Sequence, residues 1–242
     1  MSQIEVLEAI ASARRSVRIY DETIPVPDDV MQRAIDLAHL APNSSNLQLW
    51  EFIRVRDPET KKQLARACLD QKAAQTSQEM LVVAARRDQW RLHAQMNANW
   101  VSKSNPQMES KYRQNWLNYY KKLMPFIYTS DPLGILGFCK WLFLTVIGFF
   151  RPIYREVLES DLRIIAHKSC ALAAENFMLA IKAQGFDTCP MEGFDSWRAK
   201  RIVKLPWNSE ITMIISVGKA GANGGVYSAR YRIDRSETVR TI

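Results

Sequence analysis

Three arginines and one serine lie within the segment Arg14-Arg15-Ser16-Val17-Arg18-Ile19-Tyr20, near the beginning of the chain. Guanidinium groups at this spacing repel one another unless a multivalent anion lies between them. Arginine binds phosphate through a planar pair of N–H donors, and a serine hydroxyl can add a further donor. Solvated basic turns have the same composition. The segment alone therefore leaves two interpretations, an anion site and a solvated turn.

Three more distant segments supply groups that could complete an anion or cofactor site. Ala41-Pro42-Asn43-Ser44-Ser45-Asn46-Leu47-Gln48 is rich in hydrogen-bonding side chains, as expected for a loop. Cys189-Pro190-Met191-Glu192-Gly193-Phe194-Asp195 combines a proline, an acid and a glycine, and Arg230-Tyr231-Arg232 adds a basic pair near the other end. Singly, each segment could be an ordinary turn, a helix–strand connection or a solvated tail. Jointly, they favour one composite site.

The composition is that of an ordinary globular domain. The chain has 242 residues, of which 47% are hydrophobic and 24% are charged, so one α/β domain can bury a substantial core. The net charge of +8 and the pI near 9.4 favour anionic partners, such as a phosphorylated cofactor, nucleic acid or an anionic membrane surface. The basic residues are scattered and match no nucleic-acid-reading motif, so we expect no nucleic acid partner.

Neither the cysteines nor the histidines are spaced as metal ligands are. We expect reduced thiols in a cytoplasmic protein, with Cys189 packed beside the composite site and without a neighbouring base. The N-terminus lacks a basic region followed by an apolar core, so no signal peptide is expected. The side chains considered are Cys68, Cys139, Cys170 and Cys189, and His39, His93 and His167.

Hydrophobic periodicity predicts the elements that would position these groups. Helices are expected over 3–13, 27–40, 57–69, 161–184 and 196–204. Strands are expected over 50–55, 80–85 and 211–217, followed by a flexible glycine-rich turn over 218–225. Gly185 would end the fourth helix, and Asp195 would cap the fifth. The prediction is a single α+β domain over residues 1–242, with helices around a short mixed β-sheet.

Residues 86–160 interrupt this alternation and are expected to form a helical, partly apolar insertion within the domain. The apolar run from Leu133 to Phe150 contains one charge, Lys140, and is flanked by basic residues. About 18 residues is the lower limit for a transmembrane helix, and both flanks belong to one domain, which disfavours a crossing. A membrane-surface helix agrees with the basic flanks and the tryptophan. A buried lid or inter-subunit helix is favoured, because apolar runs in soluble domains are usually core or interface.

Taken together and in this order, the four segments resemble the FMN-dependent nitroreductase superfamily. Residues 14–21 are similar to its N-terminal motif, residues 41–50 to its AP-S-S-x-N-x-Q-P-W loop, residues 189–195 to its P-x-E/G-G-F segment, and Arg230-x-Arg232 to its C-terminal basic pair. Leu49 stands where that loop has proline. The resemblance covers residues 1–85 and 161–235.

The resemblance implies a nitroreductase-like fold in a domain-entwined homodimer that binds FMN at the subunit interface. It also implies ping-pong hydride transfer from NAD(P)H through flavin N5 to an electrophilic acceptor. No catalytic side chain and no metal are required, because the protein contributes position and electrostatics. The apolar insertion favours a hydrophobic acceptor, such as a nitroaromatic compound or a quinone.

The resemblance further assigns cofactor-binding residues. The phosphate and the ribityl chain would be held by Arg14, Ser16, Arg230 and Arg232. Arg18 would face the pyrimidine edge and stabilise negative charge on the reduced ring, and Arg15 would act through its backbone. The partner subunit would contribute Asn43, Ser44, Asn46 and, less directly, Gln48. One ring face would be lined by Pro190, Met191, Glu192 and Gly193, with a backbone N–H at N5, and Gln71 would add an amide.

Two other functions are compatible with the sequence. Reductive dehalogenation or flavin fragmentation would keep the fold and the cofactor but change the reaction. A non-enzymatic module that binds a membrane surface or nucleic acid would use the positive charge instead. Contact of residues 133–150 with lipid would make this cytoplasmic protein a peripheral one at the inner membrane surface.

Overall fold

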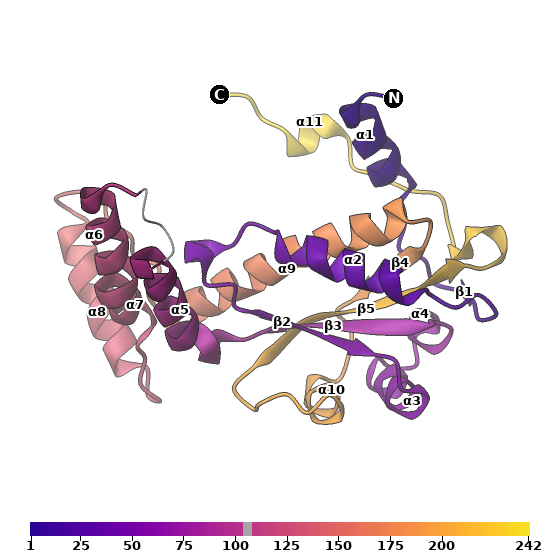
Figure 1. The fold of residues 1–242 in the computed structure, drawn as a ribbon, viewed down its shortest axis with the longest axis horizontal. Coiled ribbons are helices and arrows are strands. Elements are labelled where there is room, and N and C mark those ends of the chain that lie inside the picture. Colours follow the sequence, from indigo (N-terminus) through magenta and orange to yellow (C-terminus); the bar gives the residue numbers. More distant parts are fainter. Residues whose placement is uncertain (104–107) are drawn as a thin grey trace.

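A β-sheet forms the middle layer of the protein, and helices cover both of its faces (Figure 1). The computed structural model describes residues 1–103 and 108–242. On one face of the sheet, α2 (Asp28–His39) packs along the long helix α9 (Glu159–Ala183). The opposite face carries three shorter helices: α3 (Pro58–Ala67), α4 (Lys72–Gln75) and α10 (Ser196–Ile202). The predicted α+β class is confirmed.

The sheet has five strands in the part of the chain that the structure describes. They are β1 (Tyr20–Asp21), β2 (Trp50–Val55), β3 (Glu79–Ala85), β4 (Asp187–Met191) and β5 (Glu210–Ala220). Their order is β1-β5-β3-β2, and β4 also pairs with β5. All of these pairs are antiparallel. The named strands thus form an antiparallel sheet rather than the predicted mixed one, because two long connections each join neighbouring strands. α3–α4 joins β2 to β3, and α10 joins β4 to β5 at the opposite end of the sheet.

Every helix and strand predicted outside residues 86–160 is present close to its expected bounds. The prediction missed two strands. β1 has two residues, and β4 contains Pro190, which has no backbone N–H and is tolerated because β4 pairs with a full strand on one side only. The predicted turn over 218–225 is also wrong at its start, because β5 continues to Ala220.

The remaining short elements are α1 (Gln3–Ala13), η1 (Ser44–Asn46), η2 (Arg87–Gln89), η4 (Ala222–Gly225) and α11 (Arg235–Thr238).

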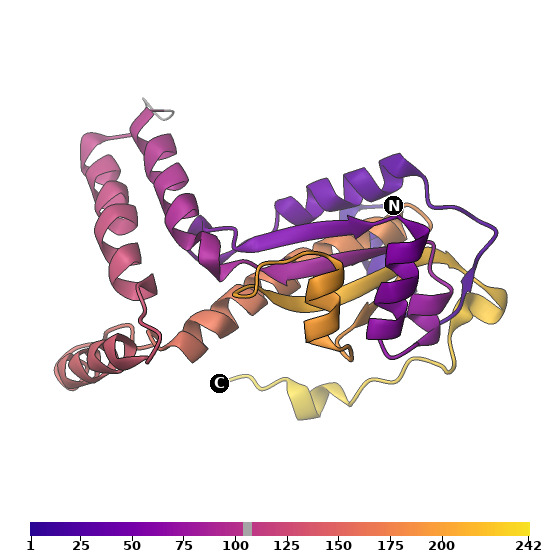
Figure 2. The same cartoon turned by 90° about the horizontal axis from the view of Figure 1, so that it is seen from below.

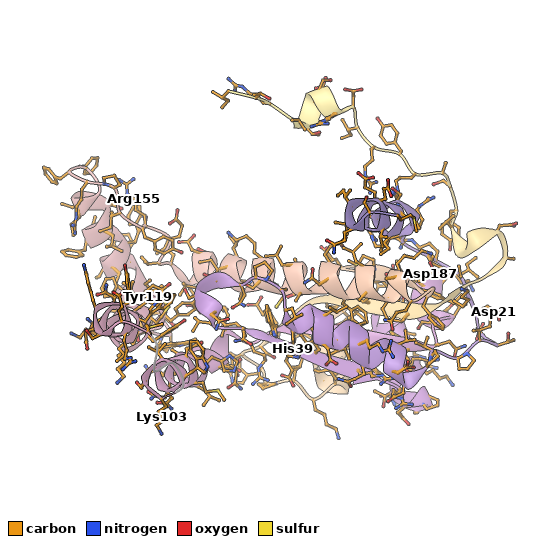
Figure 3. All side chains as sticks on the ribbon, turned by 45° about the horizontal axis from the view of Figure 1, so that its top comes forward. Asp21, His39, Lys103, Tyr119, Arg155 and Asp187 are labelled. Atoms are coloured by element: carbon orange, nitrogen blue, oxygen red, sulfur yellow. The ribbon has the colours of Figure 1, made fainter. Side chains whose placement is uncertain are left out.

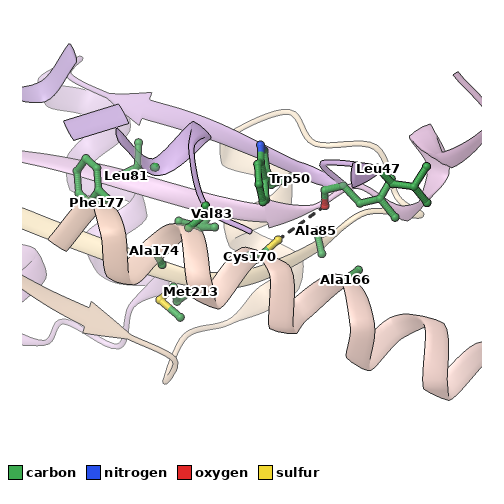
Figure 4. Packing of buried hydrophobic residues seen from close by; sticks show 14 of the residues in the cluster. Leu47, Trp50, Leu81, Val83, Ala85, Ala166, Cys170, Ala174, Phe177 and Met213 are labelled. Atoms are coloured by element: carbon green, nitrogen blue, oxygen red, sulfur yellow. Dashed lines mark hydrogen bonds between the residues drawn. The ribbon is translucent and has the colours of Figure 1, made fainter. Parts of the chain in front are cut away.

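Helix α9 supplies much of the core. Its side chains Ala166, Cys170 and Phe177 pack against the apolar side chains of β3 (Figure 4). The Cys170 thiol lies 3.7 Å from the carbonyl oxygen of Leu49, which fixes the end of the 41–48 loop against the helix. By length and hydropathy α9 could cross a membrane, but half of its most apolar window is buried inside the fold. Its burial between α2 and the sheet identifies it as the central core helix.

Residues 90–157 contribute a helical arm that projects from one end of the sheet (Figure 2). The arm consists of α5 (Trp90–Lys103), α6 (Ser110–Asn118), the π-helical turn η3 (Tyr119–Leu123), α7 (Met124–Tyr128) and α8 (Ile135–Ile147). Residues 104–107 of the predicted insertion lie outside the described residues. The apolar run forms a helix of 13 residues, too short to cross a bilayer, which needs about 20. Within this chain most of its side chains are exposed, so it is not core.

The two ends of the chain meet beside β1. The carbonyl oxygen of Gly225 accepts hydrogen bonds from the backbone N–H groups of Arg18, at 2.6 Å, and Ile19, at 3.1 Å. Gly225 has φ +64°, a conformation that side chains disfavour, and a Cβ there would collide with the Ile19 carbonyl and the Val17 side chain. The neighbouring Gly224 has φ +73°, but a Cβ there would meet open space. Gly225 therefore holds the C-terminal segment against the arginine cluster.

We expect Gly225→Ala to cost at least about 3 kcal/mol of unfolding free energy, because it combines left-handed strain with steric overlap. Gly224→Ala is the matched control and should cost about 1 kcal/mol, since only the strain applies. Urea unfolding monitored by circular dichroism measures both values. Equal losses in the two variants would show that Gly225 does not hold the two ends together.

Candidate functional site

Residues from both ends of the chain line one polar cavity of about 310 Å³. The N-terminal segment contributes Arg14, Arg15, Ser16 and Arg18, and the C-terminal segment contributes residues 226–232, including Arg230 and Arg232. Five guanidinium groups thus surround a small volume, and none of the lining residues is acidic. Such a concentration of positive charge is suited to a multivalent anion.

Backbone contacts fix the two segments that form this arginine cavity. The N–H of Val17 donates to the carbonyl of Thr188 at 3.0 Å, and Ser16 and Thr188 form an isolated parallel bridge, the one parallel contact of the described sheet. The Arg230 guanidinium donates to the carbonyl of Arg14, and Arg15 Nη2 donates to the carbonyl of Ser228 at 2.6 Å. The structure therefore places the predicted residues of the two termini and the start of β4 side by side.

Arg14 has the most constrained guanidinium group of the cluster. Its side chain is 20% exposed, and its Nε lies 3.9 Å from the Glu175 carboxylate. Its Nη1 is buried and has no hydrogen-bond partner among the described residues. A buried donor without an acceptor costs about 1–3 kcal/mol. An anion in the cavity would supply that acceptor.

The segment after Thr188 starts beside the arginine cavity, but Pro190, Met191, Glu192 and Gly193 do not line it. Pro190 and Met191 belong to β4, and the exposed Glu192 and Gly193 follow it. The side-chain amide of Gln71 donates to the carbonyl oxygen of Gly193 at 2.8 Å and to that of Cys68 at 3.1 Å. Gln71, which the resemblance selected, is thus in contact with this segment and fixes the orientation of the peptide after Gly193.

Cys189 is a packing residue beside the arginine cavity. Burial raises the pKa of its thiol, and the nearby Arg18 and Arg14 offset only part of that effect. Burial likewise raises the pKa of Cys68 to about 12 and that of Cys170 to about 11. Because the thiolate is the nucleophilic form of cysteine, these buried residues are poor nucleophiles.

The 41–48 loop lies elsewhere in the chain. In Figure 3, Tyr119, which contacts this loop, and Asp187, which begins β4, are at opposite ends of the molecule. None of Asn43, Ser44, Asn46 and Gln48 lines the arginine cavity of its own chain. Three non-glycine residues in or beside the loop have positive φ angles, at Ser45, Asn46 and Gln48. Backbone strain of this kind persists only where neighbouring contacts hold it, and it is common at functional sites.

Side chains of the helical arm hold the strained loop. The Ser45 hydroxyl lies 2.7 Å from that of Tyr119, and Tyr120 donates to the Ser45 carbonyl at 3.2 Å. Asn97 exchanges two hydrogen bonds with Asn46, and His93 Nδ1 lies 2.6 Å from the Leu47 carbonyl oxygen. These supporting residues were not predicted from the sequence. Their one sequence signal is the spacing of His93 and Asn97, which places two polar side chains on one face of a helix.

An apolar cavity of about 370 Å³ lies between the loop, the arm and α9. Ser44 and Ser45 form one edge, Leu123 and Leu144 come from the arm, and none of the lining residues carries a charge. Burial raises the pKa of Tyr128, which also lines the cavity, to about 12, so its hydroxyl stays protonated. The chemistry of the lining suits a hydrophobic molecule.

The chain is similar to known proteins over most of its length. The model of the nitroreductase family matches residues 11–219. The Bacillus subtilis protein YodC, which carries the name NAD(P)H nitroreductase, is 28% identical over 211 residues, 87% of this chain and 88% of YodC. An enone reductase of CLA biosynthesis from Lactiplantibacillus plantarum is 25% identical over 219 residues, 90% of this chain and 87% of that protein. A structure from Exiguobacterium sibiricum, solved in complex with FMN, shares the fold with a TM-score of 0.68 at 22% identity, covering 98% of this chain and 97% of that one.

Thiol labelling tests the assignment of the cysteines. At mildly alkaline pH we expect iodoacetamide to modify the exposed Cys139 alone in the native protein, and all four cysteines after unfolding. Peptide mass mapping identifies the modified residue, and Cys139→Ser should abolish native labelling. Rapid modification of Cys189 in the folded protein would contradict its assignment as a packing residue.

Proposed function

The chain belongs to the nitroreductase family, and from that premise we propose that it is an FMN-dependent oxidoreductase that transfers hydride from NAD(P)H to a hydrophobic acceptor. The observation that carries the proposal is the convergence of arginines from both ends of the chain on one cavity. The unpartnered, buried Nη1 of Arg14 supports an anionic ligand there. The names of the relatives support a flavin cofactor and a nicotinamide donor.

The residues of the arginine cavity fit the phosphate of FMN. Arg14, Ser16, Arg230 and Arg232 would hold the phosphate and the ribityl chain, since guanidinium groups bind a dianion through charge-assisted hydrogen bonds. Arg18 would stabilise negative charge at the pyrimidine edge, and the Pro190–Gly193 segment would line one ring face, with Gln71 fixing the peptide after Gly193. FMN held by these residues would supply hydride-transfer chemistry at N5, between NAD(P)H and the second substrate in a ping-pong sequence.

A second copy of the chain would complete the site, because no residue of the 41–48 loop lines the arginine cavity of its own chain. Three exposed features support a homodimer. No side chain of α1 is buried in this chain, the outer side of α9 exposes Ile164 and Leu172, and residues 227–242 are exposed. In such a dimer Asn43, Ser44, Asn46 and Gln48 of one chain would reach the cofactor of the other.

The apolar cavity next to Ser44 and Ser45 is the proposed site for the acceptor. Its uncharged lining supports a quinone, a nitroaromatic compound or a related hydrophobic molecule, and one relative carries the name of an enone reductase of CLA biosynthesis. Reductive dehalogenation and flavin fragmentation use the same cofactor and remain the second candidate. Turnover of halophenols in place of quinones would select the dehalogenase.

Arg14→Met tests the cofactor site. We expect the variant to bind FMN about tenfold or more weakly, because it loses charge-assisted hydrogen bonds to the phosphate. Arg33→Met is the matched control, since Arg33 is exposed on α2 and is absent from the cavity lining. Titration of the flavin-free proteins with FMN, followed by flavin fluorescence, gives both affinities.

An unchanged affinity in Arg14→Met would exclude this cavity as the phosphate site. A wild-type protein that binds no flavin and bleaches none with NAD(P)H would instead favour the non-enzymatic function.

Leu123→Gln tests the acceptor site. Leu123 is 43% exposed and lines the apolar cavity, so the variant should fold but raise the KM for a long-chain quinone by about tenfold. The KM for a small soluble nitroaromatic compound should change little. Leu92→Gln is the control, because Leu92 is 54% exposed on the same arm and does not line the cavity. Equal changes for both acceptors would count against this site.

A further inference from the structure

The outer side of α8 is an apolar surface that nothing else in the described chain covers. We call this surface the α8 face. Its exposed side chains are Leu133, Ile135, Leu136, Phe138, Leu142, Phe143, Val146, Phe149 and Phe150. Phe143 is 59% exposed and Phe150 is 86% exposed. These large apolar side chains are contiguous on and beside one helix. A contiguous exposed apolar surface of this kind marks an interaction site, whereas single exposed apolar residues do not.

The one charged residue of α8 is turned away from this face. Lys140 is 7% exposed, and its ammonium group donates to the carbonyl oxygens of Phe126 at 2.9 Å, Ile127 at 2.9 Å and Thr129 at 2.7 Å. These carbonyls belong to the end of α7 and the residue after it, where backbone acceptors lack helical partners. Lys140 thus joins α7 to α8, and the outer side of α8 is left without any charge.

Both ends of α8 are satisfied by side chains of the same arm. The Asp131 carboxylate accepts hydrogen bonds from the backbone N–H groups of Leu133, Ile135 and Leu136 at 3.2, 3.1 and 2.7 Å. At the other end, Arg155 Nη2 donates to the carbonyl oxygen of Gly148 at 2.7 Å. Unsatisfied backbone groups are costly next to hydrocarbon, so these caps suit a helix that lies in an apolar medium.

Basic residues accompany the α8 face. Residues 121–156 contain five basic and two acidic side chains. Lys121, Lys122 and Arg151 are exposed, and Arg155 is placed at the tip of the arm beside the end of α8 (Figure 3). If the α8 faces of two copies packed on each other, the basic residues near them would bring like charges together, which is unfavourable. An anionic surface would neutralise these charges.

We propose that the α8 face docks on the surface of a bilayer that contains anionic lipids. A helix of 13 residues is about 20 Å long, shorter than the hydrocarbon core of about 30 Å, so α8 lies in the plane of the interface. The aromatic side chains enter the boundary between headgroups and acyl chains, and the basic residues contact the lipid phosphates. The rest of the chain stays outside, because α8 is at the tip of the arm.

The docked helix also borders the apolar cavity. Leu144, on the inner side of α8, lines that cavity together with Ser45. If the proposed function holds, on which this last step alone rests, a hydrophobic acceptor would pass from the lipid to the cavity along a single helix.

Vesicle co-sedimentation of the purified full-length protein tests the docking. We expect binding to vesicles of phosphatidylcholine with phosphatidylglycerol, at least about tenfold weaker binding to phosphatidylcholine alone, and loss of binding at high salt. Phe143→Ser should reduce the partition coefficient by about tenfold. Trp197→Ser is the matched control, since Trp197 is also an exposed aromatic side chain but lies on α10, and its binding should match the wild type.

Lys121→Glu/Lys122→Glu provides a second variant that removes charge without touching the apolar side chains. It should weaken binding to anionic vesicles and leave circular dichroism unchanged.

Failure of the wild-type protein to sediment with anionic vesicles would overturn the proposal. So would a change of molecular mass by light scattering in Phe143→Ser with unaltered vesicle binding, which would assign the face to a contact between copies. Because the readout needs no flavin, its failure is distinct from failure of the proposed enzyme activity.

Discussion

Repulsion between the positive charges of the arginine cavity is the main physical constraint on the proposed cofactor site. Five guanidinium groups line a cavity of about 310 Å³. Three of these groups donate to backbone carbonyls, those of Arg14, Ser228 and Tyr231, and the Nη1 of Arg14 has no acceptor among the described residues. The surrounding structure brings the arginines together, through the pairing of Val17 with Thr188 and the contact of Gly225 with Arg18. A phosphate dianion would turn this repulsion into attraction.

The helical arm places polar and apolar side chains around the strained 41–48 loop. The arm fixes Ser45 and Asn46 through Tyr119, Tyr120 and Asn97, and thereby maintains positive φ angles that the loop could not hold alone. The same arm lines the apolar cavity beside the loop. A change in the arm would therefore affect both the loop and the cavity. The arm, residues 90–157, is thus connected to the proposed acceptor site.

Much of this arrangement could be predicted from the sequence, because the local patterns of apolar and basic residues agree with the elements and the cavity that the folded chain forms. Periodic apolar residues located α2, α9 and β3, and the arginine-rich ends identified one cavity. β4 was missed because Pro190 argues against a strand, and only pairing with β5 shows that the missing N–H faces no partner. The supports at His93 and Asn97 were missed because their partners are backbone and amide groups almost fifty residues away. The exposure of α8 depends on where Lys140 points, which composition does not reveal.

The most direct test of the central claim is the ratio of the affinities for FMN and riboflavin, which differ by the phosphate group. If the arginines of both termini bind that phosphate, FMN should bind at least about a hundredfold more tightly, and added salt should reduce the ratio. Equal affinities for the two flavins would contradict the claim, because the arginine cavity would then contribute nothing to cofactor binding.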